Sequence, residues 1–359
     1  MIIGIVKVFL PSIIAFIVGI AITPIITHYL YKYKLWKKQS VQKTIDGREA
    51  TISAALHNDE VKKTPRMGGL VVWLSVTFTA VLFWFLAYIT RADIFTNLDF
   101  LSRNQTWLPL ATLIFGGMVG FVDDFLGTQG GAGKGSYIGG GLSLKKRLLI
   151  VGLMGLFCAS WFYFKLDINT IGIPVIGDVG LGLFFIPLFV IVVIGIYSGG
   201  VIDGIDGLSG GILASIFSAY AGIAFYQQQI DLAAFCAVLV GGILAFLWFN
   251  IPPARFFMSE TGMMGLTITL AVIAFMTDSL GGGYGVIVLP IIAFPLVLTS
   301  LSNIIQVTSK KLRNGKKVFM VAPIHHHFQA IGWPSYKVTM RFWIIGVIFA
   351  ILGMTIALI

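Results

Sequence analysis

The sequence predicts an all-α integral membrane protein with about ten transmembrane helices. Hydrophobic residues make up 57% of the 359 residues and charged residues only 11%, and the mean hydropathy is +0.93, far from the balance of a soluble globular protein. A helix needs roughly 20 apolar residues to cross a hydrocarbon core about 30 Å thick, and runs of this length recur along the chain. No segment between them is long or polar enough for a soluble domain, so we expect residues 1–359 to form one polytopic domain.

Ten apolar runs have the length of a span. The first could be taken for a signal peptide, but it is about 26 residues long and lacks a small-residue cleavage pattern, so we interpret it as a retained span. Gly and Pro inside several runs are tolerated because neighbouring membrane helices can satisfy the freed backbone groups. The runs lie near residues 2–27, 68–90, 106–127, 145–164, 181–200, 207–226, 231–249, 261–278, 284–307 and 338–358.

Lys and Arg residues are concentrated in every second loop between these runs. Nine lie in 28–66, four in 123–147, one in 250–260 and seven in 308–341, so 21 of the 25 follow an odd-numbered span. By the positive-inside rule these loops face the cytoplasm and both termini lie outside it. The membrane thereby accounts for the net charge of +10, and we expect no nucleic-acid partner. A further role of this charge in attracting anionic lipid or nucleotide substrates stays open.

Five acidic residues gather on the same predicted side. Asp123 and Asp124 end the third span, Asp203 and Asp206 follow the fifth, and Glu260 begins the eighth. A single acid in such a place is usually a hydrated helix end, but acids that border spans are costly and are usually functional. The folded bundle is therefore expected to bring these five side chains together at the cytoplasmic surface.

The spacing of the acids suggests their chemistry. Asp203 and Asp206 are three residues apart, so on a helix they would share one face and could bind one cation or polar ligand together. Asp123 and Asp124 would point about 100° apart on a helix and so would have different roles. Oxygen ligands alone favour Mg²⁺ over zinc, and Mg²⁺ usually combines one or two carboxylates with substrate phosphates.

Three other features carry weaker signals. The stretch GGAGKGSYIGG at 130–140 has Gly135 where a phosphate-binding loop needs Ser or Thr, and no strand precedes it. Cys158 and Cys236 fall inside predicted spans and indicate neither a disulfide nor a metal cluster. The consecutive histidines 325–327 lack the spacing of helical zinc ligands, and in a basic loop they favour phosphate binding or proton transfer.

Six motifs occur in order over nearly the whole chain. They are TPRMGG (64–69), GFVDDF (120–125), DGIDGL (203–208), FLWFN (246–250), FFMSETG (256–262) and APIHHHFQAIGWPSYKVTMRFWII (322–345). Taken together, these stretches resemble the phospho-N-acetylmuramoyl-pentapeptide transferase (MraY) family of polyprenyl-phosphate sugar-phosphate transferases. Related N-acetylhexosamine-1-phosphate transferases share the Asp-rich motifs but not the triple-His, Gly-Trp-Pro segment, which makes the last stretch the most specific.

The resemblance implies a Mg²⁺-dependent exchange at the cytoplasmic face of the inner membrane. Undecaprenyl phosphate would attack the β-phosphate of UDP-N-acetylmuramoyl-pentapeptide, giving lipid I and UMP for peptidoglycan synthesis. A homodimer is one oligomeric state that stays open.

The resemblance also implies roles for individual residues. The acids Asp123 and Asp124 would lie in the catalytic centre, with one as base or nucleophile, and Glu260 would bind Mg²⁺. His325 would join the catalytic group beside the substrate phosphates. The expected substrate-binding residues are Lys62, Lys63, Asp203, Asp206, Asn250, Phe257, His326 and His327.

The chain departs from the family pattern at several positions. A Gly-Asp pair is usual where this chain has Ser259 and Glu260, Asn is usual at Gly200, and Thr is usual at Arg66. The Gly that normally precedes TP is missing, and a common Lys after the Asp pair is replaced around Gly127. None of these changes removes a catalytic carboxylate, but they bear on how the nucleotide is held.

Three alternatives remain at this stage. A transferase of the same superfamily acting on UDP-N-acetylglucosamine would share the acids, although the triple-His segment argues against it. An ion-coupled transporter would also place acids in broken spans, but near the bilayer midplane rather than at helix ends. An inactive scaffold protein would account for the altered motifs.

Overall fold

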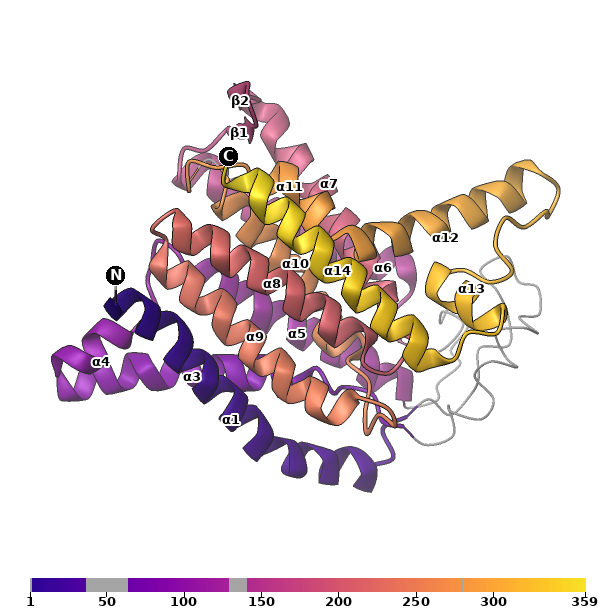
Figure 1. Cartoon of the computed structure of the whole chain (residues 1–359), viewed down its shortest axis with the longest axis horizontal. Coiled ribbons are helices and arrows are strands. Elements are labelled where there is room, and N and C mark those ends of the chain that lie inside the picture. The colour runs from indigo at the N-terminus through magenta and orange to yellow at the C-terminus, as the bar shows by residue number, and fades with distance from the viewer. Residues whose placement is uncertain (1, 37–63, 129–140, 279) are drawn as a thin grey trace.

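The computed structural model describes residues 2–36, 64–128, 141–278 and 280–359 as a bundle of long helices (Figure 1). The N-terminus of α1 and the C-terminus of α14 lie on the same side of the bundle, and the short helix α13 lies on the other. The helices are α1 (Ile2–Lys32), α3 (Leu70–Thr90), α4 (Asp93–Leu98), α5 (Trp107–Thr128), α6 (Leu144–Ser160), α7 (Phe185–Ser198), α8 (Leu208–Tyr226), α9 (Ile230–Asn250), α10 (Ser259–Met276), α11 (Gly285–Ile292), α12 (Phe294–Leu312), α13 (Ile324–Ala330) and α14 (Ser335–Ala357).

The predicted spans are confirmed in number. Within the described ranges nine helices are long and apolar enough to cross a membrane, and the bent pair α11 and α12 makes a tenth. The span predicted near 284–307 is a bent pair of helices, because the chain turns by 71° between α11 and α12. Pro295 lies in the first turn of α12, where a residue without a backbone N–H is tolerated.

A small β-hairpin was not predicted. Strand β1 (Thr170–Ile173) pairs antiparallel with β2 (Gly177–Gly180) in the loop between α6 and α7. The hairpin is tied to the bundle by Asp278, whose carboxylate accepts hydrogen bonds from the backbone N–H of Gly172 at 2.7 Å and of Val286 at 2.9 Å. These four-residue strands are too short to stand out among longer apolar runs.

Helix α10 forms the centre of the bundle. Its apolar window is 94% buried inside the protein, against 22% for α1 at the edge. Helix α5 approaches α10 so closely that a Cβ on Gly120 would lie 2.0 Å from the backbone oxygen of Glu260. Only glycine permits this contact, and it brings the end of α5 against the beginning of α10.

Candidate active site

Asp124 joins the end of α5 to the first turn of α10. Its Oδ2 accepts hydrogen bonds from the backbone N–H of Thr261 at 2.8 Å and from the Thr261 hydroxyl at 2.7 Å. Its Oδ1 lies 3.0 Å from Nη2 of Arg66. The side chain is buried, so this carboxylate balances both a helix N-terminus and a guanidinium group.

Asp123 faces a different set of partners. Its Oδ1 accepts a hydrogen bond of 2.6 Å from the backbone N–H of Leu142, and its Oδ2 lies 3.9 Å from Nη1 of Arg147. The two neighbouring carboxylates therefore point toward different elements, as their adjacent positions on a helix predict.

Glu260, the second residue of α10, shares Arg147 with Asp123. Nη1 of Arg147 donates a hydrogen bond to Oε1 of Glu260. The hydroxyl of Tyr197, from α7, donates to Oε2 at 3.1 Å. One guanidinium nitrogen thus lies between the carboxylates of Asp123 and Glu260, and α5, α6, α7 and α10 meet at this point.

Asp203 and Asp206 lie in the turn that leads from a 3-10 helix (Gly199–Ile202) into α8. The helical stacking considered for them is not present, because the backbone leaves the helical conformation at Asp203 (φ −75°, ψ 81°), where the 3-10 helix ends. Asp203 accepts hydrogen bonds from the Ser209 hydroxyl and from the backbone N–H of Ser259, both at 2.7 Å. Desolvation raises the pKa of Asp203, and these two hydrogen bonds oppose that shift.

Asp206 has a separate partner. Its Oδ2 accepts a hydrogen bond of 2.9 Å from the backbone N–H of Ala254, while desolvation raises its pKa. Asp206 therefore connects the turn to the loop between α9 and α10, and Asp203 connects it to the first residue of α10.

Asn250, at the end of α9, is buried between backbone segments. Its Oδ1 accepts from Gly207 N–H at 2.9 Å, and its Nδ2 donates to the Phe256 carbonyl at 2.8 Å. Phe257 is half-buried, and its backbone N–H donates to the Pro65 carbonyl at 3.0 Å. The structure thus places Asn250 beside the turn that holds Asp203 and Asp206, and Phe257 against the segment that precedes α3.

The histidines of α13 approach the same turn. The rings of His325 and His326 are buried and their centroids lie 4.3 Å apart. A Cβ on Gly204 would lie 2.8 Å from Nε2 of His326, so glycine is required where the histidine meets the turn. His327 faces away, since its Nδ1 accepts from Met320 N–H at 3.3 Å. Lys62 and Lys63 lie outside the described residues.

Three contributors to this site were missed from the sequence. Arg147 was counted only among the basic flanks of spans, Tyr197 was read as part of an apolar run, and Thr261 was not considered. The one available signal was Arg147, which is the third residue of the predicted span 145–164. A charged side chain inside a span is costly unless it has a partner.

The oxygen donors present suit Mg²⁺ in part. Across the described ranges, no group of three or more His, Cys, Asp or Glu side chains is placed to hold a metal ion. However, Asp123 and Glu260 already share one cationic nitrogen from Arg147. Since Mg²⁺ is commonly held by one or two carboxylates plus substrate phosphates and water, this pair fits a site that substrate completes.

Comparisons with known proteins identify the family of the chain. Residues 106–278 match the model of the family described as glycosyl transferase family 4. The phospho-N-acetylmuramoyl-pentapeptide-transferase of Anoxybacillus flavithermus is 33% identical, covering 96% of this chain and 95% of its own. Proteins of the same name from a Geobacillus species (31%; 97% of each chain) and Listeria innocua (30%; 96% of each chain) are similar over the same extent. The chain therefore belongs to the phospho-N-acetylmuramoyl-pentapeptide-transferase family.

Proposed function

We propose that the chain transfers phospho-N-acetylmuramoyl-pentapeptide from its UDP derivative to undecaprenyl phosphate, in the first membrane step of peptidoglycan synthesis. An oxygen of the polyprenyl phosphate attacks the β-phosphorus of the nucleotide substrate, and the bond from that phosphorus to the bridging oxygen breaks. UMP leaves with the bridging oxygen, and lipid I carries the new pyrophosphate. Full-length relatives bearing the transferase name support this reaction.

The observation that carries the proposal is the convergence of Asp123, Arg147 and Glu260 from three helices. Phosphoryl transfer depends more on positioning and charge neutralisation than on covalent chemistry. Asp124 and Arg66 add a third carboxylate and a second guanidinium group. These charged groups can exchange ion-pair partners when a pyrophosphate binds.

Mg²⁺, held by Glu260 and Asp123 together with substrate phosphates, would supply part of that neutralisation. Arg147 would then share its carboxylates with the metal and orient toward phosphate oxygens, for which a guanidinium group is well suited. Asp123 is the more exposed of the adjacent acids to a substrate, because Asp124 is committed to Thr261 and Arg66. We assign Asp123 as the group that accepts the acceptor's proton or orients its phosphate.

The nucleotide lies on the opposite side of this centre in our proposal. Asn250 and Phe257 would hold the uracil, next to Asp203 and Asp206. His325 and His326 would contact the phosphates and sugar, because they border Gly204 in the same turn. Lys62, Lys63 and His327 would add positive charge or hydrogen bonds at the rim.

We place the site at the cytoplasmic face of the inner membrane, because the basic loops flank it. The acids and their described partners belong to one copy of the chain.

The test is UMP release by purified protein in lipid nanodiscs, with UDP-N-acetylmuramoyl-pentapeptide, undecaprenyl phosphate and Mg²⁺. Release that depends on all three, together with a lipid product of the expected mass, supports the proposal. A parallel reaction with UDP-N-acetylglucosamine distinguishes the related sugar-phosphate transferases. Preference for that donor, or no release with either, contradicts the proposed function.

A further inference from the structure

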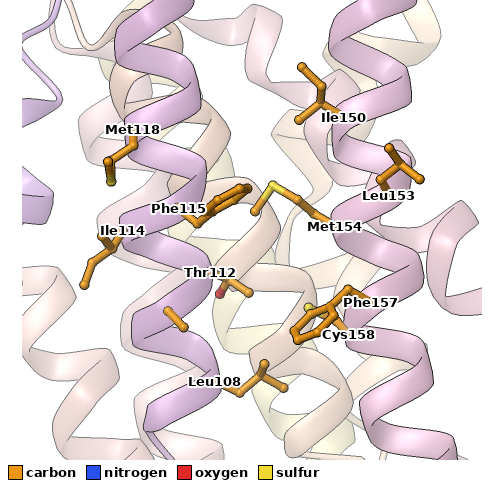
Figure 2. A pocket seen from close by; sticks show the side chains of 11 residues that line it. Leu108, Thr112, Ile114, Phe115, Met118, Ile150, Leu153, Met154, Phe157 and Cys158 are labelled. Atoms are coloured by element: carbon orange, nitrogen blue, oxygen red, sulfur yellow. The ribbon is translucent and has the colours of Figure 1, made fainter.

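The bundle presents two kinds of surface to the membrane. Between α5 and α6 lies a cavity of about 700 Å³ whose lining is almost entirely hydrocarbon (Figure 2). The Thr112 hydroxyl in its wall donates to the Pro109 carbonyl at 2.9 Å, and no charged side chain belongs to its lining. The outward face of α14 is different, because it combines exposed hydrocarbon with two cations.

Helix α14 has one buried face and one exposed face. Phe342 is buried, and the Thr339 hydroxyl donates to the Asp206 carbonyl at 3.0 Å. Residues at steps of three or four lie on one side of a helix, and on the exposed side these are Lys337, Arg341, Ile344, Ile348 and Leu352. Since α14 is long and apolar enough to cross a membrane, Ile344 and Ile348, which are 60% and 57% exposed, face acyl chains. The two cations lie at one end of this apolar row.

Both cations lie over one indole ring. Nζ of Lys337 is 5.2 Å from the centroid of the Trp333 ring, and the guanidinium carbon of Arg341 is 4.2 Å from it. The Trp333 side chain is half-buried and stacks on Phe328 of α13, with ring centroids 4.7 Å apart. A cation over an aromatic face is attracted by the ring, so the indole holds two like charges side by side. We refer to Trp333, Lys337 and Arg341 as the Trp333 cluster.

The positive-inside rule accounts for cations at the end of a span but not for this arrangement. Lys145 and Lys146, in the first turn of α6, are also exposed, yet within the described ranges neither lies over an aromatic ring. In the same ranges no carboxylate forms an ion pair with Lys337 or Arg341. Two adjacent cations without an acid between them favour an anionic partner.

We propose that the Trp333 cluster binds the headgroup phosphate of an anionic glycerophospholipid such as phosphatidylglycerol. A guanidinium group that lies over an aromatic face keeps its peripheral N–H groups for phosphate oxygens, and Lys337 adds a second positive charge. A headgroup that carries an ammonium is disfavoured, because it would meet two like charges. Ile344 and Ile348 lie about 4.5 and 10 Å along the axis from Arg341, so they contact the acyl chains of the same lipid.

The cluster is also connected to the helix that carries the histidines. The backbone N–H of Trp333 donates to the Phe328 carbonyl at 3.0 Å, and Nε2 of Gln329 donates to the Ser335 hydroxyl at 2.8 Å. Together with the stacked rings, these bonds join α13 to the beginning of α14. A phospholipid held at the cluster would therefore also restrain α13.

Native mass spectrometry of the purified protein, with phosphatidylglycerol and without any polyprenyl phosphate, measures the affinity. We expect Lys337→Gln/Arg341→Gln to weaken binding of the first phosphatidylglycerol at least about tenfold, since each cation near a membrane surface attracts anionic lipid. The matched control, Lys145→Gln/Lys146→Gln, removes the same charge and should weaken binding less than about threefold. Equal losses in the two variants would overturn the assignment, as would equal affinity of the unaltered protein for phosphatidylcholine.

Two further comparisons separate the ring from the charge and a lipid from a free phosphate. Trp333→Leu keeps both cations and should weaken phosphatidylglycerol binding about threefold, whereas Trp333→Phe should retain most of the affinity. Unchanged affinity of the Leu variant would show that the ring has no part in the site. Glycerol 3-phosphate at the concentration of the lipid should not displace it. Displacement would contradict a phospholipid site, because the hydrocarbon would then contribute nothing.

Photo-crosslinking in vesicles locates the bound lipid. A benzophenone side chain in place of Ile344 would be irradiated in equimolar phosphatidylglycerol and phosphatidylcholine, and adducts with phosphatidylglycerol should exceed the others about threefold. The control position is Leu149, which follows Lys146 by three residues on α6 and is 63% exposed; its adducts should be near equal. Equal adducts at Ile344, or adducts with a second copy of the chain, contradict the assignment. None of these measurements requires turnover, so their outcome is independent of the proposed function.

Discussion

Arg147 donates a hydrogen bond to Glu260, and the same guanidinium nitrogen lies 3.9 Å from Asp123. A charged side chain from α6 thus lies between two carboxylates that belong to α5 and α10. The arrangement makes Glu260 the residue at which a structural role and a metal-binding role can best be separated.

Glu260→Gln is expected to abolish activity, because the change removes the charge that would hold Mg²⁺ while keeping the shape of the side chain. Glu260→Asp should retain some activity with an altered Mg²⁺ requirement, since Mg²⁺ demands oxygen distances near about 2.0–2.1 Å. A Mg²⁺ titration of UMP release measures both. If Glu260 serves only to place negative charge at the start of α10, a role worth about 0.3–1 kcal/mol, the Gln variant will keep its turnover and its Mg²⁺ dependence.

Asp123→Asn and Asp124→Asn should each lower kcat by at least about 10²-fold, the low end of the loss for a general base. The two variants should differ in stability. Asp124→Asn withdraws the carboxylate from Arg66 and Thr261, so its Tm in detergent should fall further than that of Asp123→Asn. Near-normal turnover of both variants, with intact folding by size-exclusion chromatography, would make the pair structural.

Ser259 has a φ of +55°, a conformation that costs a non-glycine residue about 1–2 kcal/mol. Its hydroxyl accepts a hydrogen bond of 3.2 Å from Nε of Arg66. Ser259→Ala loses this bond and keeps the strain, whereas Ser259→Gly loses the bond and relieves the strain. We therefore expect the Gly variant to be more stable than the Ala variant by about 1 kcal/mol. Equal midpoints of thermal unfolding for the two would show that the backbone is not strained.

Arg66 and Ser259 are both departures from the family pattern, and the structure joins them directly. A double-mutant cycle with Arg66→Thr and Ser259→Gly should show a coupling of at least about 0.5 kcal/mol in stability, as expected of residues in contact. Additive effects within that value would mean that the two departures are independent. A matched cycle with Ala21→Phe and Ser259→Gly provides the additive reference.

The orientation of the bundle can be measured by thiol labelling. Both native cysteines, Cys158 and Cys236, are buried, so they give a low background. A cysteine at Asn314 should react with a membrane-impermeant maleimide only after the cells are opened, because seven Lys and Arg lie in 308–341. A cysteine at Val175, in the fully exposed turn of the β-hairpin, should react in intact cells. The reverse pattern would invert the predicted topology.

The sequence was sufficient to predict the features that depend only on the length and order of apolar runs. Span number follows from apolar length, which is why each of the ten runs has a helix or helix pair. The bend at Ala293 was not foreseen, since Pro290 and Pro295 are both compatible with a single kinked span. Which proline would mark a true break depends on packing that a single run does not encode.

The candidate site was foreseen in its acids and not in their partners. Asp123, Asp124 and Glu260 stood out because acids that border membrane spans are costly and are usually functional. The hydroxyl of Tyr197 and the guanidinium of Arg147 became part of the site only when α6 and α7 were placed beside α10. The separation of Asp203 from Asp206 likewise depended on the turn that begins at Asp203, where the 3-10 helix ends.

The close approach of Gly120 to Glu260 has a mechanical consequence. At this point helices α5 and α10 touch through their backbones, so no side chain separates Gly120 from Glu260. The backbones that carry Asp123, Asp124 and Glu260 therefore form one rigid unit. The distances between these three backbone positions are fixed before substrate binds. Adjustment during a reaction must come from parts outside that unit: the guanidinium arms of Arg66 and Arg147, and the separate helix that carries the histidines.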